Sequence, residues 1–277
     1  MMELSSDHFN KLSQQIYIRL GLQFEEKKSY FLQKRVEKRM AVLGFVDPQE
    51  YVFLLCYADS EGKEMQALAN LITTNETYMF REFEQLEAFA NCCLPEVLSA
   101  KQSRGEQKLR IWSAGCSSGE EPYSLAIILR EIFPQSQYWD CEIVATDIDE
   151  NVLAQAAAAR YWWRSVREVP PEYLEKHFIQ EGERYTIRPN TASMVRFQHL
   201  NLHDRMSMRA MRNFDFVFCR NVLIYFDDLS RKSAVDHFYN SLNHGGYLFL
   251  GHSESVGRIS SAFKLKRMDT HLVYVKE

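Results

Sequence analysis

The stretch LRIWSAGCSSGEEPYSL, residues 109–125, decides the fold class of this chain. A short hydrophobic run at 109–112 leads into a turn that contains Gly115 and Gly119, and an apolar helical pattern follows at once. This order of strand, glycine turn and helix is typical of doubly wound α/β folds that bind a nucleotide-like ligand. The stretch therefore predicts a parallel sheet with crossover helices.

The predicted helix after this turn begins with two acidic residues, Glu120 and Glu121. The N-terminus of a helix attracts anions, so a pyrophosphate placed there would meet two carboxylates. The turn therefore disfavours a dinucleotide and favours a ligand with cationic groups and no phosphate. S-adenosylmethionine, which carries a sulfonium and an ammonium charge, fits this description.

Polar side chains follow three further strand-like runs. Asp147 ends one of these runs, and Asn201 and Asn221 follow two others. In doubly wound folds such an acidic residue accepts hydrogen bonds from ribose hydroxyls, usually about 20 residues after the glycine turn. A longer loop at 134–140 would explain the greater spacing found here. Each residue alone also fits a solvated strand end or a turn, but together they favour one crevice that binds ribose, adenine and a methionine moiety.

The rest of the chain divides into a helical part and an alternating part. Helical patterns are predicted at 7–20, 25–43, 48–57, 64–72 and 82–100, and the polar stretch 100–108 is interpreted as a linker. Strands and helices then alternate at 109–113, 120–133, 142–146, 150–159, 214–219, 228–243 and 247–250, with Gly245-Gly246 ending the last helix and a hairpin at 263–275. Between them, a short helical piece after Pro170-Pro171 and two β-like runs at 184–188 and 193–197 indicate a small β insertion.

The composition disfavours several classes of protein. With a net charge of −4 and a pI near 6.1, the chain lacks the basic balance of nucleic-acid-binding proteins. It shows no disulfide spacing, no signal peptide and no apolar run long enough for a bilayer, so we expect a cytoplasmic protein without membrane insertion. His199 and His203 have the spacing of a helical metal pair but follow a strand-like run, so no metal site is predicted.

The predicted helix at 25–43 has one cationic face. Lys28, Lys34, Arg35, Lys38 and Arg39 share that face, and a neighbouring face carries Leu32, Val36, Met40 and Leu43, which are predicted to pack on other helices. The cationic face is either simply solvated or docks an acidic partner, and both interpretations stay open.

Five ordered motifs resemble those of the CheR family, the S-adenosylmethionine-dependent methyltransferases that modify glutamates of bacterial chemoreceptors. The resemblance extends over about residues 5–275. Its specific parts are TTNETYMFR at 73–81, WSAGCSSGEEPYS at 112–124, TDID at 146–149, FCRNVLIYF at 218–226 and GHSE at 251–254. The composition of 73–81 alone would instead indicate a helix cap at Thr74 or Asn75.

The resemblance implies the residues of the site. Those expected to bind the cofactor, S-adenosylmethionine, are Asn75, Thr77, Arg81, Glu121, Asp147, Asn201, Leu202, Asn221 and Val222. Arg81 and Tyr225 match the family's residues nearest the methyl-transfer centre and are the expected catalytic residues. The implied reaction is methyl transfer to a glutamate carboxylate, which is already ionised at neutral pH and needs no general base.

The resemblance also implies the fold and the partners. It implies an all-α N-terminal domain (1–80) and a class I methyltransferase domain (81–277), an α/β doubly wound sheet with a small antiparallel β-subdomain at about 165–198. Lys34, Arg35, Lys38 and Arg39 of the basic helix would meet the acidic methylation helix of a methyl-accepting chemotaxis receptor. Some family members also bind a receptor's C-terminal pentapeptide through a glycine-bearing loop of the β-subdomain. The matching stretch, 179–187, is short here, so we expect no such tether.

Two alternatives remain beside this function. The chain could methylate a different substrate, although a small-molecule enzyme has no need of the cationic helix. It could also be a signalling module that binds S-adenosylmethionine without turnover, although the presence of Arg81 and Tyr225 favours an enzyme.

Overall fold

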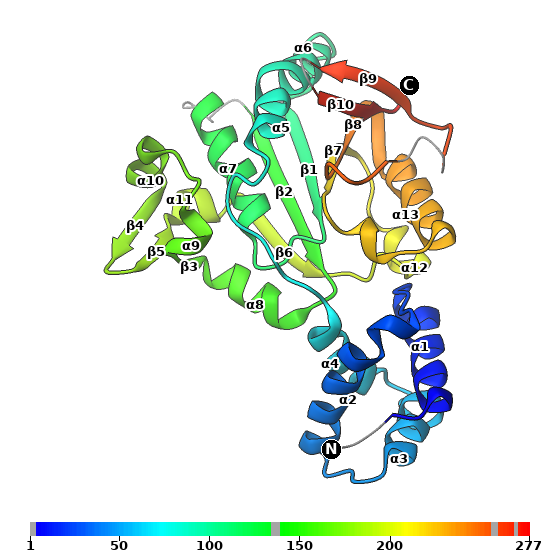
Figure 1. The fold of residues 1–277 in the computed structure, drawn as a ribbon. Helices are drawn as coiled ribbons and strands as arrows, with labels where there is room; N and C mark the ends of the chain where they lie inside the picture. The colour runs from blue at the N-terminus through cyan, green and yellow to red at the C-terminus, as the bar shows by residue number, and fades with distance from the viewer. Residues whose placement is uncertain (1–3, 134–138, 256–259, 269–270) are drawn as a thin grey trace.

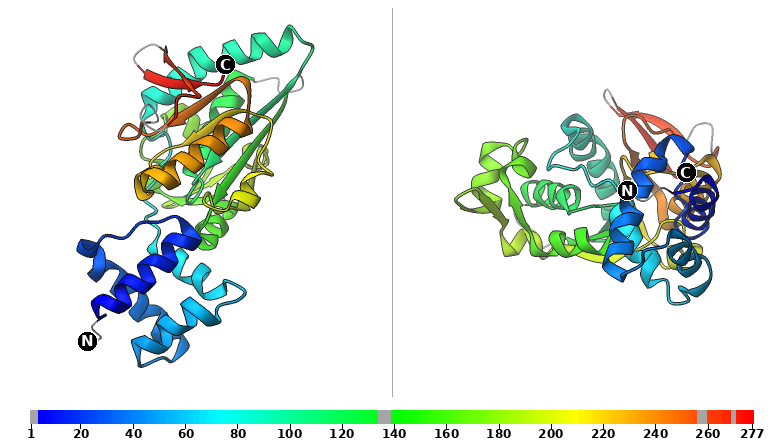
Figure 2. Two further views of the ribbon diagram at one scale, coloured as in Figure 1. Left: turned by 90° about the vertical axis from the view of Figure 1, so that its right-hand side faces the viewer. Right: turned by 60° about the horizontal axis from the view of Figure 1, so that its bottom comes forward.

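A bundle of helices lies at one end of a mixed β-sheet (Figure 1). This computed structural model describes residues 4–133, 139–255, 260–268 and 271–277. The left view of Figure 2 also shows the N-terminal helices beyond one end of the sheet. The expected all-α N-terminal domain, doubly wound sheet and small antiparallel sheet are thereby confirmed.

The α-helices of the N-terminal bundle begin and end at the signals seen in the sequence. They are α1 (Ser6–Leu20), α2 (Ser29–Leu43), α3 (Pro48–Phe53) and α4 (Lys63–Ile72). Gly21 ends α1 in a left-handed conformation, and the Asp47 side chain caps α3 ahead of Pro48. Two predicted helices divide: a 3₁₀ turn (Glu26–Lys28) precedes α2, and a π-helical turn (Leu54–Ala58) continues α3.

The apolar face predicted on α2 is confirmed except at its end. Leu32, Val36 and Met40 are buried in the core of the bundle. Leu43 is not, because 42% of its surface is exposed. It is the last residue of α2, and the chain leaves the helix at Gly44, so no neighbouring helix covers it.

The helix predicted at 82–100 forms three consecutive pieces. They are α5 (Phe83–Ala88), a π-helical turn (Phe89–Cys93) and α6 (Leu94–Gln102). The π-helical turn places the ring of Phe89 edge-on against three rings of the sheet, those of Phe216, Phe218 and Phe249, at 4.9, 5.3 and 6.0 Å between centroids. These contacts attach the segment before β1 to the sheet.

The stretch 100–108, which its polar composition indicated as a linker, is a connection only at residues 103–107. The helix α6 continues to Gln102, and β1 begins at Lys108. Lys101 is 6% exposed, and its Nζ lies 2.9 Å from a carboxylate oxygen of Asp215, itself buried. A lysine is buried only when such a partner compensates its charge, and the partner lies too far along the chain to be predicted.

The described strands of the large sheet follow the order β6-β2-β1-β7-β8-β10-β9. The first five in this order are parallel, and β10 and β9 form the predicted hairpin at the edge. The strands are β1 (Lys108–Ala114), β2 (Asp140–Asp147), β6 (Val195–His199), β7 (Phe214–Cys219), β8 (Leu242–Leu250), β9 (Lys264–Met268) and β10 (His271–Val275).

Both faces of the central strands are buried, as parallel sheets require. One face packs against α7 (Glu120–Ile132) and the π-helical turn at Phe89–Cys93. The helix α8 (Glu150–Ala158) covers β2 and β6. The other face, with Trp112 and Val217, packs against α12 (Arg205–Met208) and α13 (Asp228–Ser241). The helix predicted at 228–243 ends earlier, at Ser241. Gly245-Gly246 do not end this helix as predicted, because they lie inside β8, where the pairing with β7 is irregular.

The small antiparallel sheet is confirmed, but one of its expected strands belongs elsewhere. It has the order β3-β5-β4, with β3 (Arg160–Trp162), β4 (Phe178–Glu181) and β5 (Arg184–Ile187). The helices α9 (Trp163–Val166), α10 (Pro171–His177) and α11 (Pro189–Ala192) flank it. The run at 193–197 was assigned to this insertion, and that is wrong: it forms β6, which pairs with β2 in the large sheet. Its alternating pattern shows a strand but does not show its partner.

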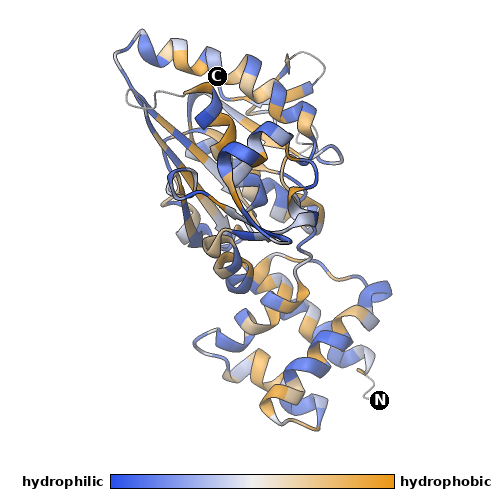
Figure 3. Cartoon of the chain, turned by 90° about the vertical axis from the view of Figure 1, so that its left-hand side faces the viewer, coloured by the Kyte–Doolittle hydropathy of each residue, from blue (hydrophilic) through white to orange (hydrophobic). Residues whose placement is uncertain are grey.

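The hydropathy pattern follows this architecture. Hydrophobic and hydrophilic residues alternate along the helices of the bundle and of the sheet layers (Figure 3). Among the described residues, no helix combines the length and the apolar composition needed to cross a bilayer.

Candidate functional site

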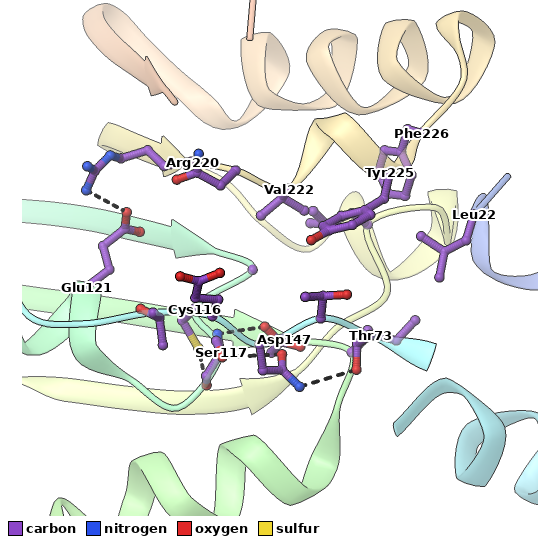
Figure 4. A pocket seen from close by; sticks show the side chains of 18 of the residues that line it. Leu22, Thr73, Cys116, Ser117, Glu121, Asp147, Arg220, Val222, Tyr225 and Phe226 are labelled. Atoms are coloured by element: carbon purple, nitrogen blue, oxygen red, sulfur yellow. Dashed lines mark hydrogen bonds and ion pairs between the residues drawn. The ribbon is translucent and has the colours of Figure 1, made fainter. Parts of the chain in front are cut away.

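A cavity of about 300 Å³ lies at the carboxyl ends of the central strands, between the sheet and the N-terminal bundle. Open α/β sheets bind their ligands at this edge, next to the first strand. All the residues that the sequence assigned to a site line this one cavity: Asn75, Thr77, Arg81, Glu121, Asp147, Asn201, Leu202, Asn221, Val222 and Tyr225. Figure 4 shows Val222 and Tyr225 on one side of it, with Ser117 and Asp147 facing them.

The glycine turn between β1 and α7 forms one wall. Gly115 and Gly119 have φ angles of 78° and 92°, which residues with a side chain rarely adopt. A Cβ on Gly115 would lie 2.4 Å from a methyl group of Val222. Glycine at this position therefore lets the turn approach the segment that follows β7.

Asp147 ends β2 and is 8% exposed. One carboxylate oxygen accepts a hydrogen bond from the Ser117 N–H at 2.7 Å, and the other accepts from the Asp149 N–H at 2.9 Å. Burial raises the pKa of the Asp147 carboxyl group. Since each carboxylate oxygen has two lone pairs, Asp147 keeps acceptor capacity for the hydroxyl groups of a ligand.

The segment 73–81 connects the bundle to the sheet domain along the cavity. The helix cap that its composition indicated is wrong, because α4 ends at Ile72 and α5 begins only at Phe83. Instead, the Asn75 amide donates to Asp149 at 3.0 Å and accepts from the Ser117 hydroxyl at 3.3 Å. Asn75 thus joins this segment to the glycine turn and to the loop after β2.

The two acidic residues at the start of α7, Glu120 and Glu121, have different surroundings. Glu121 borders the cavity and accepts from the Ser113 hydroxyl at 2.7 Å and from the Arg220 guanidinium at 3.3 Å. Burial raises the pKa of Glu121, against the opposing effect of Arg220. Glu120 is 2% exposed, accepts from Ser118 and is not part of the cavity wall. Only Glu121 is therefore placed to meet a ligand.

Arg81 lies in a strained part of the segment. Its neighbours Phe80 and Glu82 have φ angles of 59° and 55°, a left-handed conformation that costs about 1–2 kcal/mol for each such residue. The Arg81 guanidinium donates to the Glu76 carbonyl at 2.8 Å. Tyr225 enters the cavity from the 3₁₀ turn after β7 (Leu223–Tyr225). The two expected catalytic residues thus approach the same space from separate segments.

Two asparagines hold loops at the rim. The Asn201 amide donates to the Arg19 carbonyl of α1 at 2.7 Å and accepts from the His203 N–H at 2.9 Å. Asn221 has a left-handed φ of 60°, and its N–H donates to Glu254 at 2.7 Å. Both asparagines therefore also shape the walls in which they lie.

Sequence reasoning did not assign roles to several residues of the wall. Arg220 follows the fully buried β7 and is itself 8% exposed, and a cation at the end of such a strand was the signal that could have found it. Glu254 binds the N–H groups of Asn221 and Gly251. From the bundle, Leu22, Gln23, Phe24, Lys28 and Phe31 also line the cavity. No sequence signal reveals these, because their contacts join distant parts of the chain.

The two histidines considered for a metal have different neighbours. His199 Nε2 lies 3.0 Å from the Gln66 side-chain oxygen, whereas the His203 ring packs against Gly21 and lies 6.2 Å from the ring of Tyr17. Within residues 4–133, 139–255, 260–268 and 271–277, no group of three or more His, Cys, Asp or Glu side chains could hold a metal ion.

Known proteins match the chain over nearly its whole length. The family model described as "CheR methyltransferase, SAM binding domain" matches residues 75–272, and "CheR methyltransferase, all-alpha domain" matches residues 7–73. The chain is 40% identical to Chemotaxis protein methyltransferase 2 of Vibrio cholerae, over 99% of this chain and 94% of that protein. It is 32% identical to the Chemotaxis protein methyltransferase of Borreliella burgdorferi (92% and 90%) and 33% identical to that of Escherichia coli (96% and 90%). The chain therefore belongs to the CheR methyltransferase family.

The residues of the cavity fit the cofactor of this family, S-adenosylmethionine. Two largely buried carboxylates, Glu121 and Asp147, border the space, which suits a ligand with an ammonium group and ribose hydroxyls. The acidic start of α7 disfavours a phosphate there. The chain is thus an S-adenosylmethionine-dependent methyltransferase of chemotaxis.

Proposed function

We propose that this CheR-family methyltransferase esterifies glutamate side chains of methyl-accepting chemotaxis receptors. The observation that supports this most directly is the meeting of Arg81 and Tyr225 in one cavity with the carboxylates Glu121 and Asp147. The names of the relatives point to chemotaxis, and Arg81 supplies a positive charge in the cavity for an anionic substrate. We further propose that the protein acts in the cytoplasm.

In this proposal Glu121 binds the ammonium group of the cofactor, and Asp147 binds its ribose hydroxyls. Asn75, Thr77 and Arg81 line the same space, and the pairs Asn201–Leu202 and Asn221–Val222 enclose the adenine and methionine moieties. When bound, the cofactor supplies an electrophilic methyl group on sulfur.

The substrate carboxylate needs positioning and desolvation more than it needs a base. With a reference pKa of about 4.3, a glutamate side chain is ionised at neutral pH. Arg81 orients the carboxylate in line with the methyl group, and Tyr225 donates a hydrogen bond near the transfer centre. Apolar residues of the wall, Leu22 and Phe226 among them, exclude water from the carboxylate and so preserve its nucleophilicity. A carboxylate oxygen then forms a bond to the methyl carbon while the carbon–sulfur bond breaks.

Substitutions should separate these roles. Arg81→Ala should lower turnover by more than it weakens cofactor binding, because it removes orientation of the substrate. Asp147→Ala should do the reverse, because it removes an acceptor for ribose. Calorimetry with S-adenosylhomocysteine measures the binding, and methyl transfer to receptors measures the turnover. Equal losses of both quantities in Arg81→Ala would contradict its assignment to the substrate.

The proposed receptor surface on α2 uses fewer cations than the sequence indicated. Arg39 pairs with Glu64 at 2.7 Å, largely inside the bundle. Arg35 lies 3.7 Å over the ring of Phe31 and donates to the Leu71 carbonyl. We propose that Lys38, which is exposed, and Lys34, which bonds Glu37 on its own helix, meet the acidic receptor helix.

We also propose that receptor binding does not depend on a pentapeptide tether. The strands β4 and β5 pair from Phe178 to Ile187, and only Gly182 and Glu183 connect them. Such a tight turn leaves little chain for a peptide-binding loop. Calorimetry with receptor C-terminal pentapeptides should detect no tight binding, and nanomolar affinity would overturn this part of the proposal.

The decisive experiment uses methyl-labelled S-adenosylmethionine and membranes that carry chemoreceptors of the source organism. Base treatment of the receptor band should release labelled methanol, because carboxyl methyl esters are labile to base. Label that resists base would point to another acceptor group. Binding of the cofactor without any label on receptors would favour either a different substrate or a module without turnover.

A further inference from the structure

Arg220 is a buried cation at the cavity to which the proposed mechanism gives no role. It directly follows β7, and its side chain is 4% exposed. Its guanidinium donates to Glu121 at 3.3 Å, to Glu82 at 3.1 Å and to the Arg81 carbonyl oxygen at 2.5 Å. The planar guanidinium carries several donors in a rigid arrangement, so one arginine can bridge acceptors on separate segments.

The carbonyl group that Arg220 holds belongs to the strained segment. Phe80 and Glu82, on either side of Arg81, both adopt left-handed φ angles. Such conformations persist only where the surrounding structure maintains them, and they concentrate at functional sites. Here the Phe80 N–H donates to the Ser124 hydroxyl at 2.9 Å, and Arg220 binds the next two residues. Arg220 is therefore one of the polar anchors of this turn, and it binds both Arg81 and Glu82.

We infer that Arg220 is a positioning residue for methyl transfer. It holds the backbone of Arg81 so that the Arg81 side chain reaches into the cavity, and it holds the Glu121 carboxylate at the opposite end of its guanidinium. The inference rests on the proposed function, in which Arg81 orients the substrate carboxylate. Arg220 thereby connects the side of the site that binds the cofactor with the side that orients the substrate.

The charges around Arg220 determine which substitution tests this role. Glu82 and Glu121 are both largely buried, with 14% and 13% of their side chains exposed. Removing the positive charge would leave two neighbouring carboxylates uncompensated, which destabilises a fold. Lysine keeps the charge but offers one flexible ammonium group, which cannot reproduce the bridge to the Arg81 carbonyl and both carboxylates.

Arg220→Lys should therefore lower kcat by about 10- to 100-fold, as expected for a displaced positioning group. The Kd for S-adenosylhomocysteine should change much less, and the melting temperature should stay close to that of the wild type. Arg110→Lys is a matched control, because Arg110 also binds a carboxylate (Glu142, 2.8 Å) and a carbonyl group (Arg212, 2.6 Å), but outside the cavity wall. The control should keep the wild-type kcat.

A double-mutant cycle tests whether Arg220 acts through Arg81. If it does, Arg220→Lys should have little further effect on turnover once Arg81 is alanine. An equal loss in both backgrounds would overturn the inference, as would a wild-type kcat in Arg220→Lys.

Hydrogen exchange gives a readout that does not depend on turnover. The amides of residues 80–83 should exchange faster in Arg220→Lys than in the wild type or in Arg110→Lys. Unchanged exchange at these amides would overturn the inference about Arg220. If the wild type labels no receptor, the proposed function fails, and the exchange experiment still decides the role of Arg220 in holding this segment.

Discussion

Glu121 and Asp147 are carboxyl groups that the fold buries at the edge of the cavity. Burial raises the pKa of both groups above their ordinary values. An acid with a raised pKa in the folded state stabilises the fold below its unfolded-state pKa, and this contribution is lost as the pH rises through the folded-state pKa. Cofactor binding has the opposite requirement, because a carboxylate that accepts from an ammonium or hydroxyl group is most effective when ionised. In the proposed mode of binding, the two carboxyl groups therefore link cofactor affinity to pH.

We expect the affinity for S-adenosylhomocysteine to weaken as the pH falls, and to begin weakening above the range in which ordinary Asp and Glu titrate. Binding near the raised pKa values should release protons, because the ligand favours the ionised carboxylates. Calorimetry in two buffers of different ionisation enthalpy measures this release. Glu121→Gln should bind more weakly and show a smaller pH dependence. Affinity that stays constant until the pH reaches the ordinary range of Asp and Glu would contradict the prediction.

Single residues show what a sequence can and cannot reveal about a site. Asp147 and Asn221 were found because they follow hydrophobic strands, and the carboxyl ends of parallel strands meet at one edge. Arg220 received no role because its significance comes from buried partners on other segments. Arg39 was assigned to a partner surface, since a helical projection gives the direction of a side chain but not the Glu64 that it meets inside the bundle.

At the scale of elements, α2 combines exposed and internal cations, and substitutions should separate them. Lys38→Glu should raise the KM for receptor membranes and leave kcat and stability nearly unchanged, because Lys38 is exposed. The effect should shrink as salt increases, since salt screens exposed charges. Steady-state kinetics at two ionic strengths measure this. A KM equal to that of the wild type would exclude Lys38 from the receptor surface.

Arg39→Met on the same helix should act on stability instead. It leaves the largely buried Glu64 carboxylate without its cationic partner and with the Tyr51 hydroxyl as a remaining hydrogen-bond donor. Breaking such a pair costs about 3 kcal/mol or more. Urea unfolding measures the loss, and Lys63→Met, which removes an ion pair exposed on both sides, is the matched control. A free energy of unfolding equal to that of the wild type would show that the Glu64 pair contributes no stability.

Helices and strands were predicted well where the local hydrophobic periodicity is enough to identify them. They were predicted poorly where their place in the fold depends on contacts with distant residues. The 3.6-residue pattern gave α1 and the core face of α2, and the buried run at 214–219 gave β7. The same reasoning placed 193–197 in the small sheet, because alternation marks a strand without naming its neighbour. It also interpreted 100–108 as a linker, because polar composition hides the Lys101–Asp215 pair.

At the scale of the whole molecule, the cavity belongs to both domains. Leu22 pairs with Phe226 in an isolated β-bridge, and the Gln23 N–H donates to the Tyr225 carbonyl at 3.3 Å. The Tyr17 hydroxyl donates to Asp227 at 3.0 Å, again across the two domains. The sequence predicted each domain but not this interface, because its contacts join residues about two hundred positions apart. The bundle is therefore part of the site as well as a proposed receptor surface.

Binding of the cofactor should consequently stabilise both domains together. A ligand at 100 times its Kd stabilises the native state by about 2.7 kcal/mol, and here the lining of the cavity includes Leu20, Leu22, Gln23 and Phe24 of the bundle and most of the segment 73–81. We expect S-adenosylhomocysteine to slow hydrogen exchange at 20–24 and 73–81 as well as at the glycine turn, residues 115–119. The surface of α3, which does not line the cavity, serves as the internal reference. Protection confined to the sheet domain would mean that the bundle closes the cavity without responding to its ligand, and receptor docking and cofactor binding would then be separate events.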